Sequence, residues 1–193
     1  IPFPVLAGIT NDFSADRQAV VKNAVYSDSD KIAFQSPRFW ETNDQIYGGL
    51  SFTDRDTLMT WYPSGRFLHP TGVLVAGYSF GGPATRLGSL PLAEGHAYAR
   101  QTVEKLHPGQ SGKLSDPATV HWGKVPYSLG IEGQVARSDP AGYTLMNQPD
   151  GPYLFAGEHL LLRSLSCNGK VVMVMVADQG GGPFSETTVQ AFG

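Results

Sequence analysis

Residues 152–159 have the sequence Pro-Tyr-Leu-Phe-Ala-Gly-Glu-His, which is typical of a short buried strand that ends in a small residue and a carboxylate. The apolar run follows a Pro-Asp-Gly-Pro turn, and it fits a strand packed on both faces, as in a parallel sheet. Ligands of open α/β sheets bind at the carboxyl ends of strands. Gly157 would let a ligand approach the backbone there, and Glu158 could accept hydrogen bonds from ligand hydroxyls. These residues fit equally well a strand end that binds no ligand and is followed by a solvent-exposed Glu158.

The composition is that of a globular protein. The chain of 193 residues is long enough for one domain with a core, or for parts of two. Its 41% of hydrophobic and 16% of charged residues argue against disorder. A net charge of -3 gives no basic surface, so we expect no nucleic-acid partner. The single cysteine, Cys167, excludes an internal disulfide framework.

Several kinds of site are missing from the sequence. The longest apolar run, Val171 to Ala177, is too short for a membrane span of ~20 residues, so we expect no membrane contact. The five histidines are scattered without the spacing of H-E-x-x-H, and we expect no metal. Neither G-x-G-x-x-G nor a P-loop occurs, so this chain cannot cradle a dinucleotide pyrophosphate by the usual route.

The chain begins with Ile1 rather than Met, which suggests a processed chain or an excised fragment. We therefore assign no cellular compartment from the sequence.

Periodicity and turn residues predict a mixed α/β arrangement. The clearest elements are a helix over 92–106, which Pro108 and Gly109 end, and an apolar strand over 72–80. The other expected elements are an extended lead-in over 1–6, a helix from Asp12 or Ser14 to about Tyr26, and a strand over 31–35. Aromatic segments at 39–40, 46–49 and 61–64 suit an antiparallel or mixed sheet that lines a pocket.

A G-x-S-x-G motif follows the apolar strand, at Gly77, Ser79 and Gly81. In an α/β-hydrolase this motif is the nucleophile elbow, with the serine as the attacking group. An acid at 116, 139 or 150 and a base at His159 would follow in the order which that fold requires. However, Pro83 interrupts the helix expected after the elbow, and few residues precede Ser79 to form the earlier strands. A strand followed by a glycine-rich turn is therefore favoured over a hydrolase.

Lys31, at the start of an apolar strand, has two interpretations. Such a lysine is usually a surface residue that packs its stem and solvates its amine. If it pointed into a dry pocket, it could hold a water or act on a proton, because a desolvated amine has a lowered pKa. The sequence alone favours the surface interpretation.

Taken in order, these segments resemble the C-terminal half of FAD-dependent amine oxidases, and most closely the L-amino-acid oxidases. The resemblance covers roughly residues 1 to 160. Its motifs are Lys31-Ile32 ahead of Arg38-Phe39-Trp40, Ile46 to Ser51 with Thr53-Asp54, Trp61 to Ser64, Gly72 to Ala84, His121-Trp122 with Pro126-Tyr127 and Gly130, and Phe155 to His159. On this alignment the serine of the elbow-like motif is incidental.

The resemblance implies an α/β (α+β mixed) fold, in which a substrate-binding mixed sheet accompanies the closing strands of a Rossmann-like FAD-binding domain. The N-terminal half of that domain would be absent from this chain. The implied division assigns a lead-in and helix of the FAD-binding domain to 1–30, the substrate-binding domain to 31–122, and the rest of the FAD-binding domain with a divergent tail to 123–193. Residues 160–193 match nothing in the family, and Val171 to Val176 has the pattern of a strand.

The same resemblance implies oxidative deamination of an L-amino acid to a 2-oxo acid and ammonia, with dioxygen reoxidising FAD to give hydrogen peroxide. Lys31 would be the catalytic residue, holding a water near flavin N5. Tyr62 would bind the substrate carboxylate, Trp122 and Tyr127 would form an aromatic wall beside substrate, and Gly157, Glu158 and Trp122 would contact FAD. A companion chain would carry the N-terminal dinucleotide-binding half, and this chain alone would be inactive. A non-catalytic remnant that binds no cofactor remains a further alternative.

Overall fold

The computed structural model describes residues 1–156 and divides the chain into two compact units. Unit 1 contains Ile1–Tyr26 together with the described residues from Glu132 onward, and unit 2 contains Ser27–Ile131. Two short strands, β1 (Tyr26–Ser27) and β7 (Glu132–Gly133), form a separate two-stranded sheet. The three-part division expected from the sequence stays a prediction.

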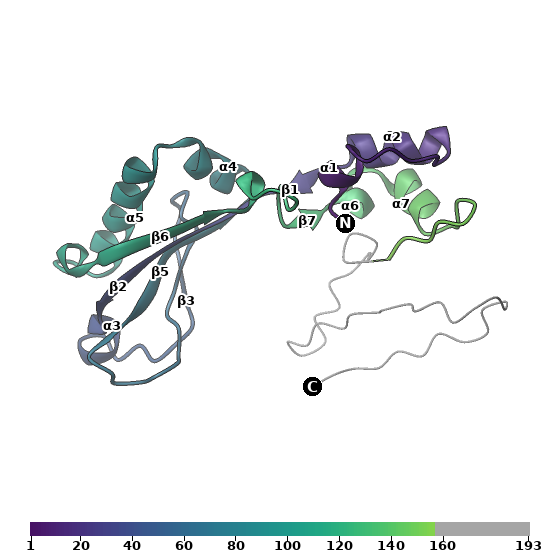
Figure 1. Cartoon of the computed structure of the whole chain (residues 1–193). Coiled ribbons are helices and arrows are strands. Elements are labelled where there is room, and N and C mark those ends of the chain that lie inside the picture. Colours follow the sequence, from purple (N-terminus) through teal and green to yellow (C-terminus); the bar gives the residue numbers. More distant parts are fainter. Residues whose placement is uncertain (157–193) are drawn as a thin grey trace. The chain divides into compact units, whose positions relative to one another are not determined.

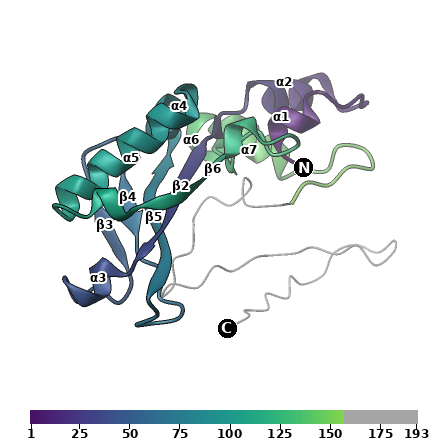
Figure 2. The same cartoon turned by 60° about the vertical axis from the view of Figure 1, so that its left-hand side comes forward.

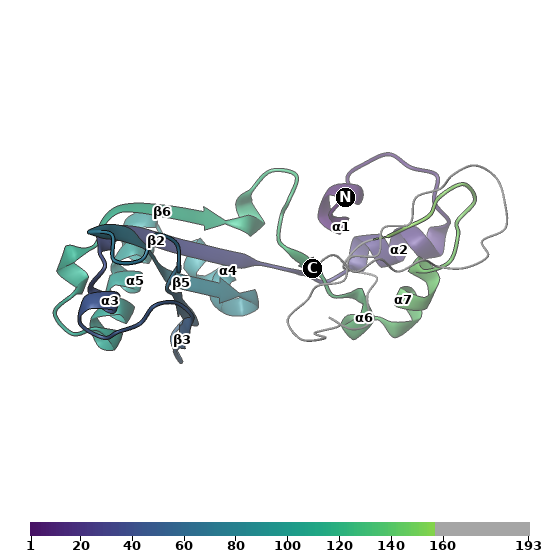
Figure 3. The same cartoon turned by 90° about the horizontal axis from the view of Figure 1, so that it is seen from below.

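Unit 2 is built on a five-stranded sheet (Figure 1). The strand order is β3-β4-β5-β2-β6, and every neighbouring pair is antiparallel. The strands are β2 (Ser29–Pro37), β3 (Leu50–Phe52), β4 (Met59–Trp61), β5 (Thr71–Phe80) and β6 (Ser115–His121). The predicted strands over 31–35 and 72–80 are thus confirmed. Figure 3 shows β2, β5 and β6 side by side.

Two helices, α4 (Gly81–Ser89) and α5 (Leu92–Leu106), pack on one face of this sheet (Figure 2). The bounds of α5 are those predicted from its apolar spacing. Apolar residues of β2 and β5 meet Ala99 and Val103 of α5 in the core. Pro83 does not break α4, contrary to expectation, because it lies in the first helical turn, where a backbone N–H is not needed.

The two faces of the sheet differ because side chains alternate along each strand. Ile32 and Phe34 of β2, with Leu74 of β5, are buried under the helices. Their neighbours Lys31 and Val73 belong to the opposite face, which we call the open face.

The first aromatic segment is helical rather than extended. Phe39–Thr42 form the short helix α3, which buries Phe39 and Trp40 in the core of unit 2. The sequence expectation of a strand-like arrangement there was wrong, because two adjacent aromatic side chains that are both buried do not fit the alternation of a one-sided strand. Short 3-10 turns at Ser111–Lys113 (η1) and Trp122–Lys124 (η2) flank β6.

Unit 1 is helical in its described part. It contains α1 (Phe3–Leu6), α2 (Ala15–Asn23), α6 (Val135–Ser138) and α7 (Pro140–Met146). The predicted helix after Ser14 is confirmed, whereas the predicted extended lead-in is wrong because Phe3–Leu6 form a helical turn. Pro2 and Pro4 do not prevent that turn, since prolines are tolerated where a helix begins.

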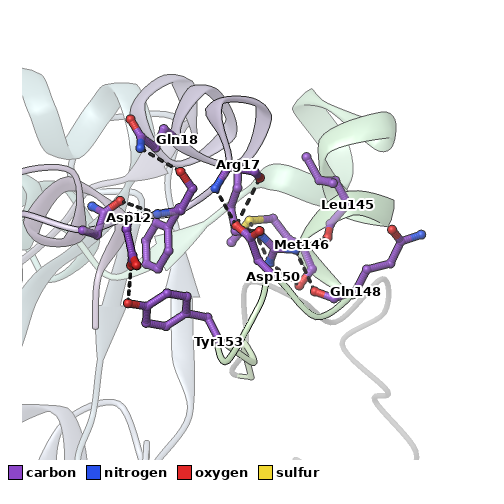
Figure 4. A network of polar contacts seen from close by, with 11 residues as sticks. Asp12, Arg17, Gln18, Leu145, Met146, Gln148, Asp150 and Tyr153 are labelled. Atoms are coloured by element: carbon purple, nitrogen blue, oxygen red, sulfur yellow. Dashed lines mark hydrogen bonds and ion pairs between the residues drawn. The ribbon is translucent and has the colours of Figure 1, made fainter.

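Arg17 of α2 connects this helix to the end of α7 (Figure 4). Its side chain is 1% exposed, and Nη2 donates to the carbonyl oxygens of Leu145 (2.8 Å) and Gln148 (2.7 Å). Its Nε lies 3.1 Å from an Asp150 carboxylate oxygen. Arg17 therefore satisfies carbonyls that the end of a helix leaves without intrahelical partners.

The strand predicted over 153–156 is not formed. Tyr153 makes only an isolated bridge with Asp150, and Leu154 is exposed. Tyr153 and Phe155 instead pack edge-on against Phe13. A strand buried on both faces needs neighbouring strands, and among residues 1–156 the only named strands outside the five-stranded sheet are β1 and β7.

Candidate functional site

Lys31 projects over two aromatic rings on the open face. Its Nζ lies 4.5 Å from the ring centroid of Tyr78 and 6.0 Å from that of Trp61. These distances allow a cation–π attraction to both rings. The side chain is half-buried, between the two interpretations of the sequence. The rings of Tyr78 and Trp61 therefore hold the Lys31 amine in place, while the amine stays accessible from the open face.

Strand register creates this arrangement. Lys31 pairs with Tyr78 of β5, and Trp61 of β4 pairs with Val75 of β5. Paired residues share a face, so three strands contribute to one cluster. Sequence reasoning did not identify Trp61 or Tyr78 as site residues. The alternating pattern of β4 was the available signal, but only the register brings these residues to Lys31.

Apolar side chains surround this cluster and remain exposed. Trp61 is 38% exposed, Phe52 of β3 is 74% exposed, and Val73 and Val120 also keep much of their surface. These residues come from β3, β4, β5 and β6, and their pairing places them on the face of Lys31. Contiguous exposed apolar surface marks a site of contact with a ligand or another polypeptide.

Tyr62 lies elsewhere in unit 2. Its side chain is 1% exposed within the core, and its hydroxyl lies 2.7 Å from His107 Nε2 and 2.9 Å from Ser51 Oγ. Burial raises the pKa of this hydroxyl. The structure does not bring Tyr62 together with Lys31, because the preceding residue, Trp61, takes the open face. Its predicted contact with the substrate carboxylate stays a prediction without support from this position.

Trp122 and Tyr127 lie in the loop that follows β6. Trp122 begins η2 and is half-buried, and its carbonyl accepts from the backbone N–H groups of Val125 (3.2 Å) and Gly130 (3.0 Å). Tyr127 is 82% exposed and has a positive φ of 65°. Their predicted roles beside substrate and FAD stay predictions.

Two predicted cofactor contacts, Gly157 and Glu158, lie outside the described residues, as do His159 and the strand-like run 171–176. Within residues 1–156 no group of three or more His, Cys, Asp or Glu side chains could hold a metal ion. No helix in this part is long and apolar enough to span a membrane.

The structure contradicts a hydrolase that uses Ser79. This residue lies inside β5 rather than at a sharp turn, is 0% exposed, and has an Oγ without a partner among the described residues. Its Cα pairs with that of Asp30 on the neighbouring strand, and within the described residues no imidazole is hydrogen-bonded to its Oγ, as a serine nucleophile would require. The sheet is also antiparallel, whereas the elbow belongs to an α/β sheet.

We therefore expect Ser79→Ala to leave the turnover of any reaction that the assembled protein catalyses within a few-fold of that of the parent protein. The hydroxyl makes no hydrogen bond within the described residues whose loss would destabilise the fold. Steady-state turnover and the thermal unfolding midpoint would be measured together. A fall in turnover on the order of 10³ with an unchanged midpoint, the scale expected for a nucleophile, would contradict this prediction.

Comparison with known proteins agrees with the pattern of motifs. The family model for flavin containing amine oxidoreductases matches residues 1–165. The chain belongs to this family. The resemblance inferred from the sequence is confirmed, and so is the expectation that the cofactor of its family is a flavin.

Several oxidases are similar to this chain. The flavin-dependent L-tryptophan oxidase RebO of Lentzea aerocolonigenes is 29% identical over 186 residues, which are 92% of this chain and 39% of that protein. The L-glutamate oxidase precursor of Streptomyces diastatochromogenes is 34% identical over 61% of this chain and 18% of its own length. The L-amino-acid oxidase of Siganus canaliculatus is 32% identical over 69% of this chain and 26% of its own length.

A solved structure of putrescine oxidase with bound putrescine shares the fold. It covers 83% of this chain and 37% of its own chain, with a TM-score of 0.61 and 14% identity. The mixed α/β fold is thus confirmed as that of an amine oxidase. The chain spans well under half the length of each of these four proteins.

Proposed function

We propose that this chain is the substrate-domain part of a flavin-dependent L-amino-acid oxidase. The main observation in support of this proposal is the open face, where Lys31 Nζ lies over the rings of Trp61 and Tyr78 among exposed apolar side chains. The names of the three similar sequences, which are oxidases of L-tryptophan, L-glutamate and L-amino acids, support an amino acid as the substrate class.

The residues of this face fit a flavin. The flavin ring system is flat and largely apolar, and a wall of aromatic and aliphatic side chains would exclude water from it. A bound flavin would supply the hydride acceptor, whose chemistry belongs to the cofactor. The protein would orient the substrate Cα–H, and Lys31 would hold a water by donating a hydrogen bond from Nζ. That water would be placed to attack the imino product, which releases ammonia and a 2-oxo acid.

FAD binding would depend on residues that this sequence does not supply. A pyrophosphate binds at a helix N-terminus with close backbone amides, and the sequence lacks the corresponding glycine motif. We propose that a companion polypeptide, or a further part of the same protein, provides the dinucleotide-binding half. Dioxygen would reoxidise the flavin and give hydrogen peroxide.

Titration of the 193-residue chain with FAD, alone and together with a polypeptide that carries the dinucleotide motif, tests this proposal. We expect tight, stoichiometric quenching of flavin fluorescence only in the combination. The combination should then release peroxide and ammonia from an L-amino acid, with its D-enantiomer as the control.

Tight quenching by the chain alone would contradict the requirement for a companion. Peroxide from putrescine but from none of the 20 common L-amino acids would contradict the substrate class. A combination that binds no FAD would favour the non-catalytic remnant instead.

A further inference from the structure

The loop that carries Trp122 is held by two carboxylates of the β2 segment. Asp30 of β2 pairs with His121 of β6, and a carboxylate oxygen of Asp30 is hydrogen-bonded to His121 Nδ1. Asp28, two residues earlier, accepts a hydrogen bond of 2.7 Å from the backbone N–H of Gly123. The residues immediately before and after Trp122 are thus both fixed by acidic side chains.

The Asp30 side of the Asp30–His121 contact is buried, and the His121 ring is mostly buried. Asp30 is 0% exposed, and burial raises the pKa of its carboxyl, against the lowering effect of the hydrogen bond and charge of His121. Gly88 of α4 lies directly against the pair, since a Cβ at this position would sit 3.5 Å from His121 Nδ1 and 3.7 Å from an Asp30 carboxylate oxygen. Lys124 Nζ donates to the carbonyl of Gly88. The helix, the two strands and the loop therefore meet at this pair.

The Asp28 contact is equally constrained. Its Oδ1 also accepts from the backbone N–H of Ser29 (2.8 Å), and its backbone carbonyl accepts from Gly81 N–H (2.9 Å). A Cβ on Gly123 would lie 2.7 Å from both carboxylate oxygens of Asp28, closer than real Cβ atoms approach. The glycine is thus required for the carboxylate to reach the backbone N–H.

We infer that Asp28 and Asp30 are positioning residues that fix the Trp122 side chain for the oxidase site. Neither carboxylate needs to touch substrate. Asp28 acts through the backbone N–H of Gly123 and Asp30 through the imidazole of His121, the two neighbours of Trp122, while strand alternation leaves Lys31, next to Asp30, on the open face. A well-packed apolar pair could stabilise the same strands equally well, so we take geometric specificity as the role of this polar contact. The catalytic consequence rests on the proposed function, but the positioning itself does not.

Fluorine NMR of protein labelled with 5-fluorotryptophan tests the positioning directly. The chain has three tryptophans, Trp40, Trp61 and Trp122, so Trp→Phe variants assign the three resonances. We expect Asp28→Ala and Gly123→Ala each to shift or broaden the Trp122 resonance, because both break the same contact from opposite sides. The Trp40 resonance should stay unchanged, since Trp40 is fully buried in the core.

Conservative and control variants complete the test. Asp28→Asn keeps an acceptor oxygen and should restore the Trp122 resonance, and the double variant Asp28→Ala/Gly123→Ala should show no more than the effect of one change. Asp56→Ala, which removes the half-buried partner of the exposed Arg86 side chain, should leave the resonance in place. In the flavin-loaded protein, Asp28→Ala should lower kcat/KM by about 10-fold to 10²-fold, the scale of a misplaced group.

Two outcomes would overturn the inference. One is a Trp122 resonance that does not respond to either Asp28→Ala or Gly123→Ala. The other is a parallel shift of the Trp40 and Trp122 resonances, which would show that the carboxylates only support the fold. If the resonances behave as expected but the parent protein forms no peroxide, the positioning is upheld and the proposed oxidase function fails.

Discussion

Replacing Lys31 with methionine is expected to slow flavin reduction by substrate, or flavin reoxidation by dioxygen, by about 10²-fold in the proposed oxidase. Lys31 Nζ is the cation seated over Tyr78 and Trp61, and its removal takes away the donor that would hold a water on the open face. Methionine keeps the length and apolar packing of the stem, so lost volume would not explain a slower reaction. Stopped-flow absorbance of the flavin would follow the two half-reactions separately.

The alternative for Lys31 is a surface residue without a catalytic role, in which case Lys31→Met would change stability by no more than about 0.5 kcal/mol and leave both rates alone. Lys105→Met is a matched control, because Lys105 is an exposed lysine at the end of α5 in the same unit. Folding and FAD content should match the parent in both variants. Unchanged rates in Lys31→Met would remove Lys31 from the site and weaken the roles inferred for the other residues.

Elements with a strong local signal could be predicted from the sequence. The helix α5 was predicted with its observed bounds, because apolar spacing begins at Leu92 and a proline and a glycine follow its last turn. The strands β2 and β5 followed from alternation and from a run of consecutive apolar residues. The order of family motifs then supplied the function class, which no single motif would have established.

Features that depend on contacts between distant segments could not be predicted. The motif at 61–64 pointed to Tyr62, yet β4 turns Trp61 toward Lys31 and buries Tyr62 against His107. The difference is one residue of register, which reverses the face of every side chain in a strand. Likewise, 153–156 has the composition of a strand, but composition does not provide the neighbouring strands that such a segment needs.

Substituting Glu41 with glutamine is expected to lower the free energy of unfolding of unit 2 by about 3 kcal/mol or more. Glu41 Oε1 accepts from Arg38 Nε (2.8 Å) and Nη2, and its Oε2 accepts from the backbone N–H of Leu68 (2.8 Å). The two side chains are only 5% and 0% exposed. Glutamine keeps the shape of the side chain but leaves the guanidinium of Arg38 buried without a counter-charge. The stability lost in this way is large when an ion pair is buried.

The pH dependence of stability separates the lost charge from altered packing. The hydrogen bond from Arg38 is the main cause that holds the pKa of Glu41 below its usual value of 4.5, even though burial opposes the shift. A carboxylate with a depressed folded-state pKa contributes stability above its unfolded pKa and loses it as the pH falls through the folded value. The gap between parent and Glu41→Gln in urea unfolding should therefore be full at pH 7 and should narrow below about pH 4.5. Asp56→Asn, which weakens the solvent-exposed pair with Arg86, is the matched control and should move the midpoint little at either pH.

The difference in unfolding free energy between parent and Glu41→Gln could instead be the same at pH 7 and pH 3. That result would mean that packing around α3, rather than the buried charge, accounts for the effect of Glu41→Gln.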